Sequence, residues 1–318
     1  MSAEKNMIRN TMRLFILLSG FMAILLYFTA ATAGPVKNRI IFLSDTQDPF
    51  WFERLFLSGN HNIEASDLIL KQVISEKPDA VFHLGDLVAA GFRQKSWHRI
   101  DPFLSQLQQN RIPFYPTLGN HELLLFPQAG FRQFMKRFPG YRPDGYKVQI
   151  GRAVVIMLNS NFGYPDEGQI TSQQSWYMQT LDSCENDPNV KVIIVGCHHP
   201  PFTNSKIVSP DEDVRKNFLP QFVATPKAKL FLSGHSHAFE HFYEYGKDFM
   251  VIGGGGGLQH PLRSRDDTLS TDLFQGGEKR RFHYLSIVLS ENEMIMQVHM
   301  IKNDFSGFEV ADRVIIQY

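Results

Sequence analysis

Short apolar runs alternate with segments of helical spacing along the chain as far as residue 232. The run 39–43 is apolar after its first residue and ends at Ser44-Asp45, which predicts a buried strand. In 63–75 the apolar residues recur at helical spacing, and Lys77-Pro78 ends that helix. The same reasoning predicts further strands at 80–82, 112–118, 146–150, 153–158, 190–195 and 229–232, and further helices at 97–109, 131–138, 172–181 and 213–223.

Beyond residue 238 the pattern changes, and the remaining apolar runs are all typical of strands. They lie at 239–245, 249–252, 284–289, 294–299 and 314–318. Alternating strands and helices followed by strands alone favour two packed sheets with helices outside, over a doubly wound Rossmann fold. We therefore predict an α/β fold of the α+β type: a four-layer α/β/β/α sandwich of two mixed sheets, forming a single domain over residues 34–318.

The N-terminal segment has the layout of an export signal. Residues 1–13 carry three basic side chains, residues 14–29 are uncharged and largely apolar, and Ala31-Thr32-Ala33 fits a cleavage site. We interpret residues 1–33 as a secretory signal peptide. The alternative is an uncleaved membrane anchor over 14–33, because about twenty uncharged residues are enough to span a bilayer. In either case we expect the remainder to be exported, to the periplasm or the extracellular space.

The charge balance and the cysteine count limit what the protein is expected to bind and how it is cross-linked. Lys plus Arg and Asp plus Glu number 32 each, so the formal charge is zero and no basic surface for nucleic acid is indicated. Two cysteines cannot form a disulfide framework. Cys197 ends an apolar run and is predicted to be a buried core thiol, with a Cys184–Cys197 bridge as the alternative. The oligomeric state has no signature in the sequence.

Five polar clusters each follow an apolar run, and they carry the candidate chemistry. Binding groups in α/β sheets gather beyond the carboxyl ends of strands, so these clusters are expected to converge. Together they supply carboxylate, amide and imidazole ligands without thiolate, a set suited to two divalent ions among Mn, Zn, Fe, Co and Ni. A hydrogen-bonded Asp/His network without metal is the alternative. The clusters are Ser44-Asp45-Thr46-Gln47, Gly85-Asp86-Leu87, Gly119-Asn120-His121-Glu122, Gly196-Cys197-His198-His199-Pro200 and Gly234-His235-Ser236-His237.

In order and residue type, these clusters resemble the motifs of the calcineurin-like metallophosphoesterases. That pattern runs Asp-x-His, Gly-Asp, Gly-Asn-His-Asp/Glu, His-x-Pro and Gly-His-x-His, and the resemblance covers roughly residues 38–318. The stretch 234–240, Gly-His-Ser-His-Ala-Phe-Glu, is similar to the purple-acid-phosphatase-like branch. The resemblance implies His121 as proton donor or transition-state stabiliser, and His198, not His199, as the ligand. The implied ligands are Asp45, Asp86 and His237 for the first metal, and Asp86, Asn120, His198 and His235 for the second.

The first motif departs from the family pattern. Gln47 stands where most of the family has histidine, and Ala89 stands where purple acid phosphatases have a compensating tyrosine. An amide oxygen is a neutral and weaker ligand than imidazole, so we expect Gln47 to ligate a first metal that is held less tightly. Without a phenolate, no purple charge-transfer colour is expected.

The resemblance implies an exported metal-dependent phosphoester hydrolase, a phosphatase or phosphodiesterase acting on small molecules. Its dinuclear metal centre would activate water for in-line attack on phosphorus. The alternative is a catalytically silent metal-binding or interaction module, which the Gln47 departure favours. A nuclease is a third option, disfavoured by the neutral charge.

Two further features are candidates for the surroundings of the site. The run 253–257 is all glycine and is either a flexible linker or a tight turn passing near the site. Five aromatic residues are candidate pocket residues or packing residues: Phe50, Trp51, Phe202, His241 and His260.

Overall fold

Strands from both halves of the chain build two six-stranded mixed sheets. The computed structural model describes residues 38–50, 53, 61–164 and 166–318. The first sheet has the order β12-β11-β10-β1-β2-β3, with bounds Phe308–Gln317, Glu293–Ile301, His283–Leu289, Asn38–Leu43, Ala80–His83 and Phe114–Pro116. The second has the order β4-β5-β6-β7-β9-β8, with bounds Tyr146–Ile150, Ala153–Met157, Val192–Gly196, Ala228–Ser233, Lys247–Ile252 and Phe239–Glu244.

Each sheet has a parallel part and an antiparallel part. In the first sheet β1, β2 and β3 are parallel, and β10 pairs with β1 in the antiparallel sense. In the second sheet β5, β6, β7 and β9 are parallel, while β4 and β8 are antiparallel edge strands. The carboxyl ends of the parallel strands therefore share one edge within each sheet, and the loops that follow them are the natural place for a site.

Successive side chains along a strand point to opposite faces of the sheet, so they enter two different hydrophobic cores. In β1, Ile40 and Phe42 enter the core between the sheets, whereas Ile41 and Leu43 face the helices beyond the first sheet. Strand β6 behaves in the same way and directs Ile193 and Val195 to the helices beyond the second sheet. Both faces of these strands are buried, which explains why their sequences are continuous apolar runs rather than alternating ones.

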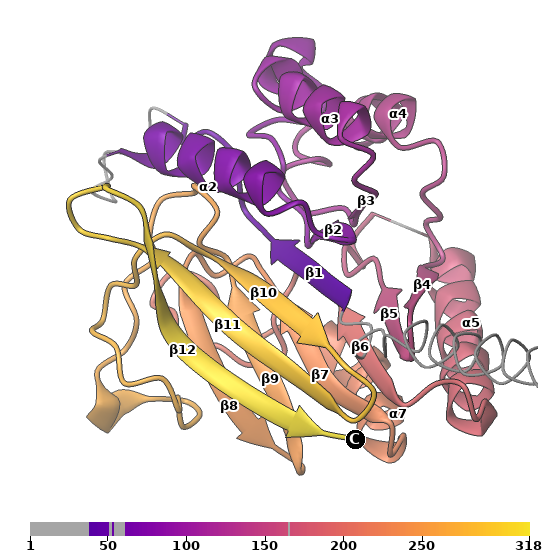
Figure 1. The fold of residues 1–318 in the computed structure, drawn as a ribbon. Helices are drawn as coiled ribbons and strands as arrows, with labels where there is room; N and C mark the ends of the chain where they lie inside the picture. The colour runs from indigo at the N-terminus through magenta and orange to yellow at the C-terminus, as the bar shows by residue number, and fades with distance from the viewer. Residues whose placement is uncertain (1–37, 51–52, 54–60, 165) are drawn as a thin grey trace, which may run out of the picture. The chain divides into compact units, whose positions relative to one another are not determined.

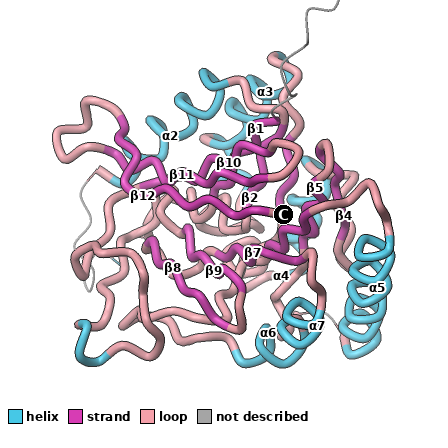
Figure 2. The backbone as a smooth tube through the Cα atoms, turned by 60° about the horizontal axis from the view of Figure 1, so that its bottom comes forward, coloured by secondary structure: helices cyan, strands magenta, loops and turns pink. Residues whose placement is uncertain are grey.

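Helices cover the outer face of each sheet. Against the first sheet lie α2 (Asn62–Glu76), α3 (Ile100–Gln109) and α4 (Pro127–Arg137), as Figure 1 shows. Their apolar side chains share a core with β1 and β2. Against the second lie α5 (Glu167–Asn186), α6 (Glu212–Asn217) and α7 (Leu219–Ala224), as Figure 2 shows. The predicted α/β/β/α layering is confirmed.

Two predicted helices are each divided in the structure. The segment 97–109 consists of a 3-10 turn, η2 (Gln94–His98), followed by α3. The segment 213–223 is split into α6 and α7 at Phe218, and Pro220 occupies the first turn of α7. Proline has no N–H to continue the preceding helix, so the chain starts a new one. A second short 3-10 turn, η3, spans Arg265–Asp267.

The remaining sequence expectations concern the N-terminus and the cysteines. The described residues belong to one compact unit, Lys37–Tyr318. The segment interpreted as a signal peptide or anchor, residues 1–33, lies outside the described residues, as does Trp51. Among the helices that the structure describes, none is long and apolar enough to cross a bilayer. Cys184 and Cys197 are both free and buried, so the predicted core thiol at Cys197 is confirmed.

Candidate metal centre

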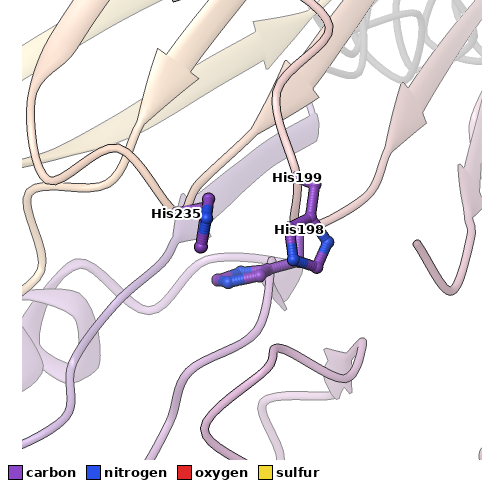
Figure 3. A group of neighbouring side chains, drawn as sticks. All are labelled: His198, His199 and His235. Carbon is purple, nitrogen blue, oxygen red and sulfur yellow. The ribbon is translucent and has the colours of Figure 1, made fainter. Parts of the chain in front are cut away.

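Loops from both sheets bring the predicted ligands together. Asp45 and Gln47 follow β1, Asp86 follows β2 and Asn120 follows β3, while the imidazoles follow β6 and β7 of the second sheet. Ligand atoms of Asp45, Asp86 and His198 all lie within 4.8 Å of one another. The same limit holds for one ring nitrogen each of His198, His199 and His235 (Figure 3). Within the described part of the chain, the predicted ligands thus form one polar cluster in the loops that follow five strands.

Three of these ligands sit on unusual backbone. Asp45, Asp86 and His235 have φ angles of 58°, 56° and 64°, in the left-handed region. A non-glycine residue there costs roughly 1 kcal/mol or more. Each of these residues lies two or three positions after the end of its strand. Strain of this kind is commonly found at functional sites.

The hydrogen bonds of His198 fix its tautomer. Its Nδ1 lies 2.9 Å from the carbonyl oxygen of Leu84, which can only accept, so Nδ1 carries the hydrogen. The other nitrogen, Nε2, then presents a lone pair to Asn120 Oδ1 at 3.0 Å and Asp86 Oδ2 at 3.3 Å. When the His198 ring is neutral, these three atoms are all acceptors and none of them has a donor. A positive ion among them would satisfy all three.

His237 has the same arrangement on the other side of the site. Its Nδ1 donates to the carbonyl oxygen of Leu258 at 2.7 Å, which leaves the Nε2 lone pair facing inward. Asp45 Oδ1 lies 3.3 Å from that nitrogen. The backbone N–H of His235 donates to Asp45 at 3.0 Å and holds the carboxylate in place.

Gln47 completes this second group of acceptors. When its amide nitrogen donates to the carbonyl oxygens of Asp86 and Asp45, at 3.0 and 3.1 Å, its Oε1 lies 3.1 Å from His237 Nε2. The opposite orientation would set Oε1 against two carbonyl oxygens. Gln47 is therefore held with its oxygen toward the same space as the His237 lone pair, where a cation would satisfy both.

Electrostatics supports the presence of positive charge at this place. Burial disfavours a charged His198, yet the carboxylate of Asp86 outweighs it and raises the pKa of the imidazole to about 9. Burial likewise opposes protonation of His237, and Asp45 reverses this to raise its pKa. Burial and then His199 hold the pKa of His235 well below its usual range, so that ring is neutral and its lone pair is available. Divalent cations fit this donor set.

His121 borders the cluster without belonging to its acceptor groups. Its backbone N–H donates to Asp86 Oδ1 at 2.8 Å, and its Nδ1 donates to the carbonyl oxygen of Ala89 at 2.8 Å. Its Nε2 lies 3.9 Å from Asp86 Oδ2, and the ring of Phe50 stacks on it with centroids 5.7 Å apart. The imidazole is fixed in position and half-buried, with Nε2 left to act on a proton.

Glu122 is a functional residue that the sequence reasoning missed. Its buried carboxylate accepts backbone N–H bonds of 2.8 Å from each of Asp86, Leu87 and Gly119. It thereby joins the loop after β2 to the loop after β3. A signal was present, because an acid directly follows the Gly-Asn-His motif.

The run of five glycines after β9 packs under the ligand loops. Gly255 and Gly257 donate backbone N–H bonds to the carbonyl oxygens of Ser44 and Asp45, at 3.0 and 2.9 Å. A side chain at Gly257 would overlap the ring of His237. The tight-turn prediction is confirmed, and the linker interpretation is wrong because each glycine packs closely against another part of the chain.

Besides Phe50, which stacks on His121, the described aromatic candidates comprise one residue beside the ligand cluster and two that lie apart. His260 stacks on His237 with centroids 4.3 Å apart and accepts a hydrogen bond from its backbone N–H. Phe202 packs in the core between the second sheet and its helices. His241 pairs with Asp248 at 2.8 Å. Only His260 among these three adjoins the ligands.

Known structures share this fold. The purple acid phosphatase PPD1 from yellow lupin (Lupinus luteus) seeds superposes with a TM-score of 0.63 at 16% identity, over 89% of this chain and 54% of that one. This chain thus spans about half the length of the lupin protein. A dimetal phosphatase from Danio rerio gives a TM-score of 0.59 at 14% identity, over 89% of this chain and 99% of that one. GAP50, the anchor in the inner membrane complex of Plasmodium, gives 0.65 at 14% identity, over 88% and 89%.

Sequence comparison identifies the family directly. The family model for calcineurin-like phosphoesterases matches residues 38–239, which include every predicted ligand from Asp45 to His237. The match covers well over half of the chain, and the fold and the cluster of acceptors agree with it. The chain therefore belongs to the calcineurin-like phosphoesterase family.

Proposed function

We propose that this chain hydrolyses small phosphoesters with two divalent cations held between the two sheets. The observation that carries the proposal is the pair of groups around His198 and His237, in which carboxylate and amide oxygens converge on the Nε2 atom of each ring and leave it facing inward. One cation would be held by Asp45, Gln47, Asp86 and His237, and the other by Asp86, Asn120, His198 and His235.

His121 has a role distinct from that of the proposed metal ligands. Divalent cations in such a site lower the pKa of a water and neutralise charge on the phosphoryl oxygens. His121 keeps its Nδ1 hydrogen on Ala89 O, so Nε2 is the atom that would take up a second proton and deliver it from the cationic ring to the departing alcohol. The fixed ring costs no reorganisation when the leaving group departs.

The donor set narrows the choice of ions. Imidazole nitrogens with carboxylate and amide oxygens suit Mn, Zn, Fe, Co or Ni. Burial raises the pKa of Cys197, and its sulfur points to the carbonyl oxygen of His199, so this thiol is no candidate ligand. Ala89 offers no phenolate, and we expect a loaded protein without purple colour.

We further propose that the protein acts after export. The basic start, apolar middle and small-residue end of residues 1–33 support export to the periplasm or the extracellular space. Cleavage would release residues 34–318 as one domain, whereas retention would tether that domain to a membrane through residues 14–33. Size comparison of the mature protein with the full chain by mass spectrometry distinguishes the two.

The proposed activity is tested by metal depletion and addition. The full chain is stripped with a chelator, and p-nitrophenyl phosphate and bis-p-nitrophenyl phosphate are assayed with Mn, Zn, Fe, Co or Ni added singly. We expect metal-restored turnover, and the ratio of the two rates assigns phosphatase or phosphodiesterase preference. Folded, metal-binding protein without turnover on either ester would overturn the proposal in favour of a silent metal-binding module.

A further inference from the structure

Ser160 fixes the tautomer of His199, the second histidine of the pair after β6. The hydroxyl oxygen of Ser160 accepts the backbone N–H bonds of His198 and His199, at 3.2 and 2.9 Å. A hydroxyl oxygen has two lone pairs and one hydrogen, so these two bonds use its accepting capacity. Its third contact, His199 Nδ1 at 2.9 Å, must therefore receive the hydroxyl hydrogen.

His199 consequently has the opposite tautomer from His198. Nδ1 of His199 accepts a hydrogen bond, so Nε2 carries the ring hydrogen, whereas in His198 the Nε2 atom carries a lone pair. One of the two adjacent imidazoles is built as a ligand and the other as a hydrogen-bond donor.

The donor lies among the proposed ligands. The ring centroid of His199 is 4.6 Å from that of His235 and 4.9 Å from that of His198. No described residue accepts a hydrogen bond from His199 Nε2, although the hydrogen-bond partner of Nδ1 is defined. A neutral N–H beside a cationic centre is suited to an anionic oxygen, and such charge-assisted bonds are the strong ones.

We propose that His199 binds a phosphoryl oxygen of the substrate and of the phosphate product through its Nε2–H, with Ser160 as its positioning residue. This assignment rests on the proposed function, because it places the phosphoryl group in the same centre. It excludes His199 as a metal ligand, since ligation would need a lone pair on Nε2 and the loss of the Ser160 bond.

Two substitutions of His199 separate these roles. In His199→Gln the side-chain amide reaches the position of Nε2 and keeps a donor there, whereas in His199→Asn it reaches only the position of Nδ1. Inorganic phosphate is titrated into each metal-loaded full-length protein by calorimetry, and metal content is measured in parallel. We expect phosphate to bind roughly 10- to 100-fold more weakly to His199→Asn, near wild-type strength to His199→Gln, and metal content to stay unchanged in both.

Ser160 supplies an independent test that leaves the ring in place. Ser160→Ala frees Nδ1 to take the hydrogen, so phosphate binding should weaken, whereas Ser160→Thr keeps the hydroxyl and should restore it. Loss of metal from His199→Asn would overturn the proposal, because His199 would then be a metal ligand. Unchanged phosphate affinity in His199→Asn would also overturn it and would show that His199 only packs against its neighbours. Equal weakening in the Asn and Gln variants would overturn the assignment to Nε2. Because phosphate binding is read without turnover, an inactive wild-type protein would contradict the proposed function alone.

Discussion

The amide oxygen of Gln47 and Nε2 of His237 lie 3.1 Å apart and face the same space once the amide nitrogen donates to the carbonyl oxygens of Asp86 and Asp45. The family places a histidine where this amide stands. The loop after β1 therefore keeps an inward-facing donor atom of a different kind. An amide oxygen is a weaker donor than imidazole, so the change concerns the affinity for the first cation more than the existence of its site.

Substitution of Gln47 by leucine should empty the first metal position selectively. Leucine has a similar size and no donor atom, so we expect the affinity for one of the two cations to fall about tenfold or more. Mass spectrometric metal analysis across a chelator series measures the loss. Gln47→His is the matched control and should raise that affinity. Unchanged occupancy in both variants would show that Gln47 is not a ligand.

Substitution of His121 by alanine should affect turnover and not metal binding. The imidazole touches the acceptor cluster only at 3.9 Å, so the cations keep their ligands, while the proton donor to the leaving group is lost. We expect kcat to fall about 10²- to 10⁴-fold on p-nitrophenyl phosphate. An equal loss of bound metal and of turnover would instead assign His121 a structural role.

Glu122→Gln should destabilise the protein. Replacing one carboxylate oxygen by an NH₂ group sets a donor against backbone N–H donors of Asp86, Leu87 or Gly119 in a fully buried place. We expect the free energy of unfolding to fall by about 2–4 kcal/mol in denaturant titration. Glu291→Gln, at an exposed position, is the control and should change it by less than about 0.5 kcal/mol.

Chelation should lower the stability of the wild-type protein. The proposed ligands come from loops of both sheets, so bound ions would hold the sheets together and stabilise only the folded state. At free metal about a thousand times the dissociation constant, each site contributes about 4 kcal/mol, which a chelator removes. In His235→Ala the chelator effect on the melting temperature should be smaller. If chelator leaves the melting temperature of the wild-type protein unchanged, metal binding between the sheets is contradicted.

The fold was predictable because its strands are buried on both faces. Runs such as 40–43 and 192–195 are continuous apolar stretches, and each ends in a polar cluster that marks the carboxyl end of the strand. Helix boundaries were less predictable. The break at Phe218 depends on Pro220, and the start of α5 at Glu167 depends on Asp166, whose side chain accepts from the backbone N–H of Gln169 at 2.8 Å.

The site was predictable as a set of residues and not as a set of hydrogen bonds. Motif spacing gives no information on which nitrogen of His198 or His199 carries the hydrogen, because Leu84 and Ser160 decide this from distant positions. The role of Glu122 likewise depends on its bond to Asp86, which lies 36 residues earlier in the chain. Such contacts arise only when the sheets have assembled.

The distribution of the proposed ligands along the chain has a consequence for the time at which metal can bind. Oxygen donors occur at positions 45 to 120, whereas every imidazole donor occurs at 198 or later, and β10, from residues 283–289, must insert between β1 and β11 to finish the first sheet. A chain still emerging from the ribosome holds carboxylates without the nitrogens that select a transition metal. We therefore expect loading to follow completion of the whole chain, in whichever compartment that folding occurs.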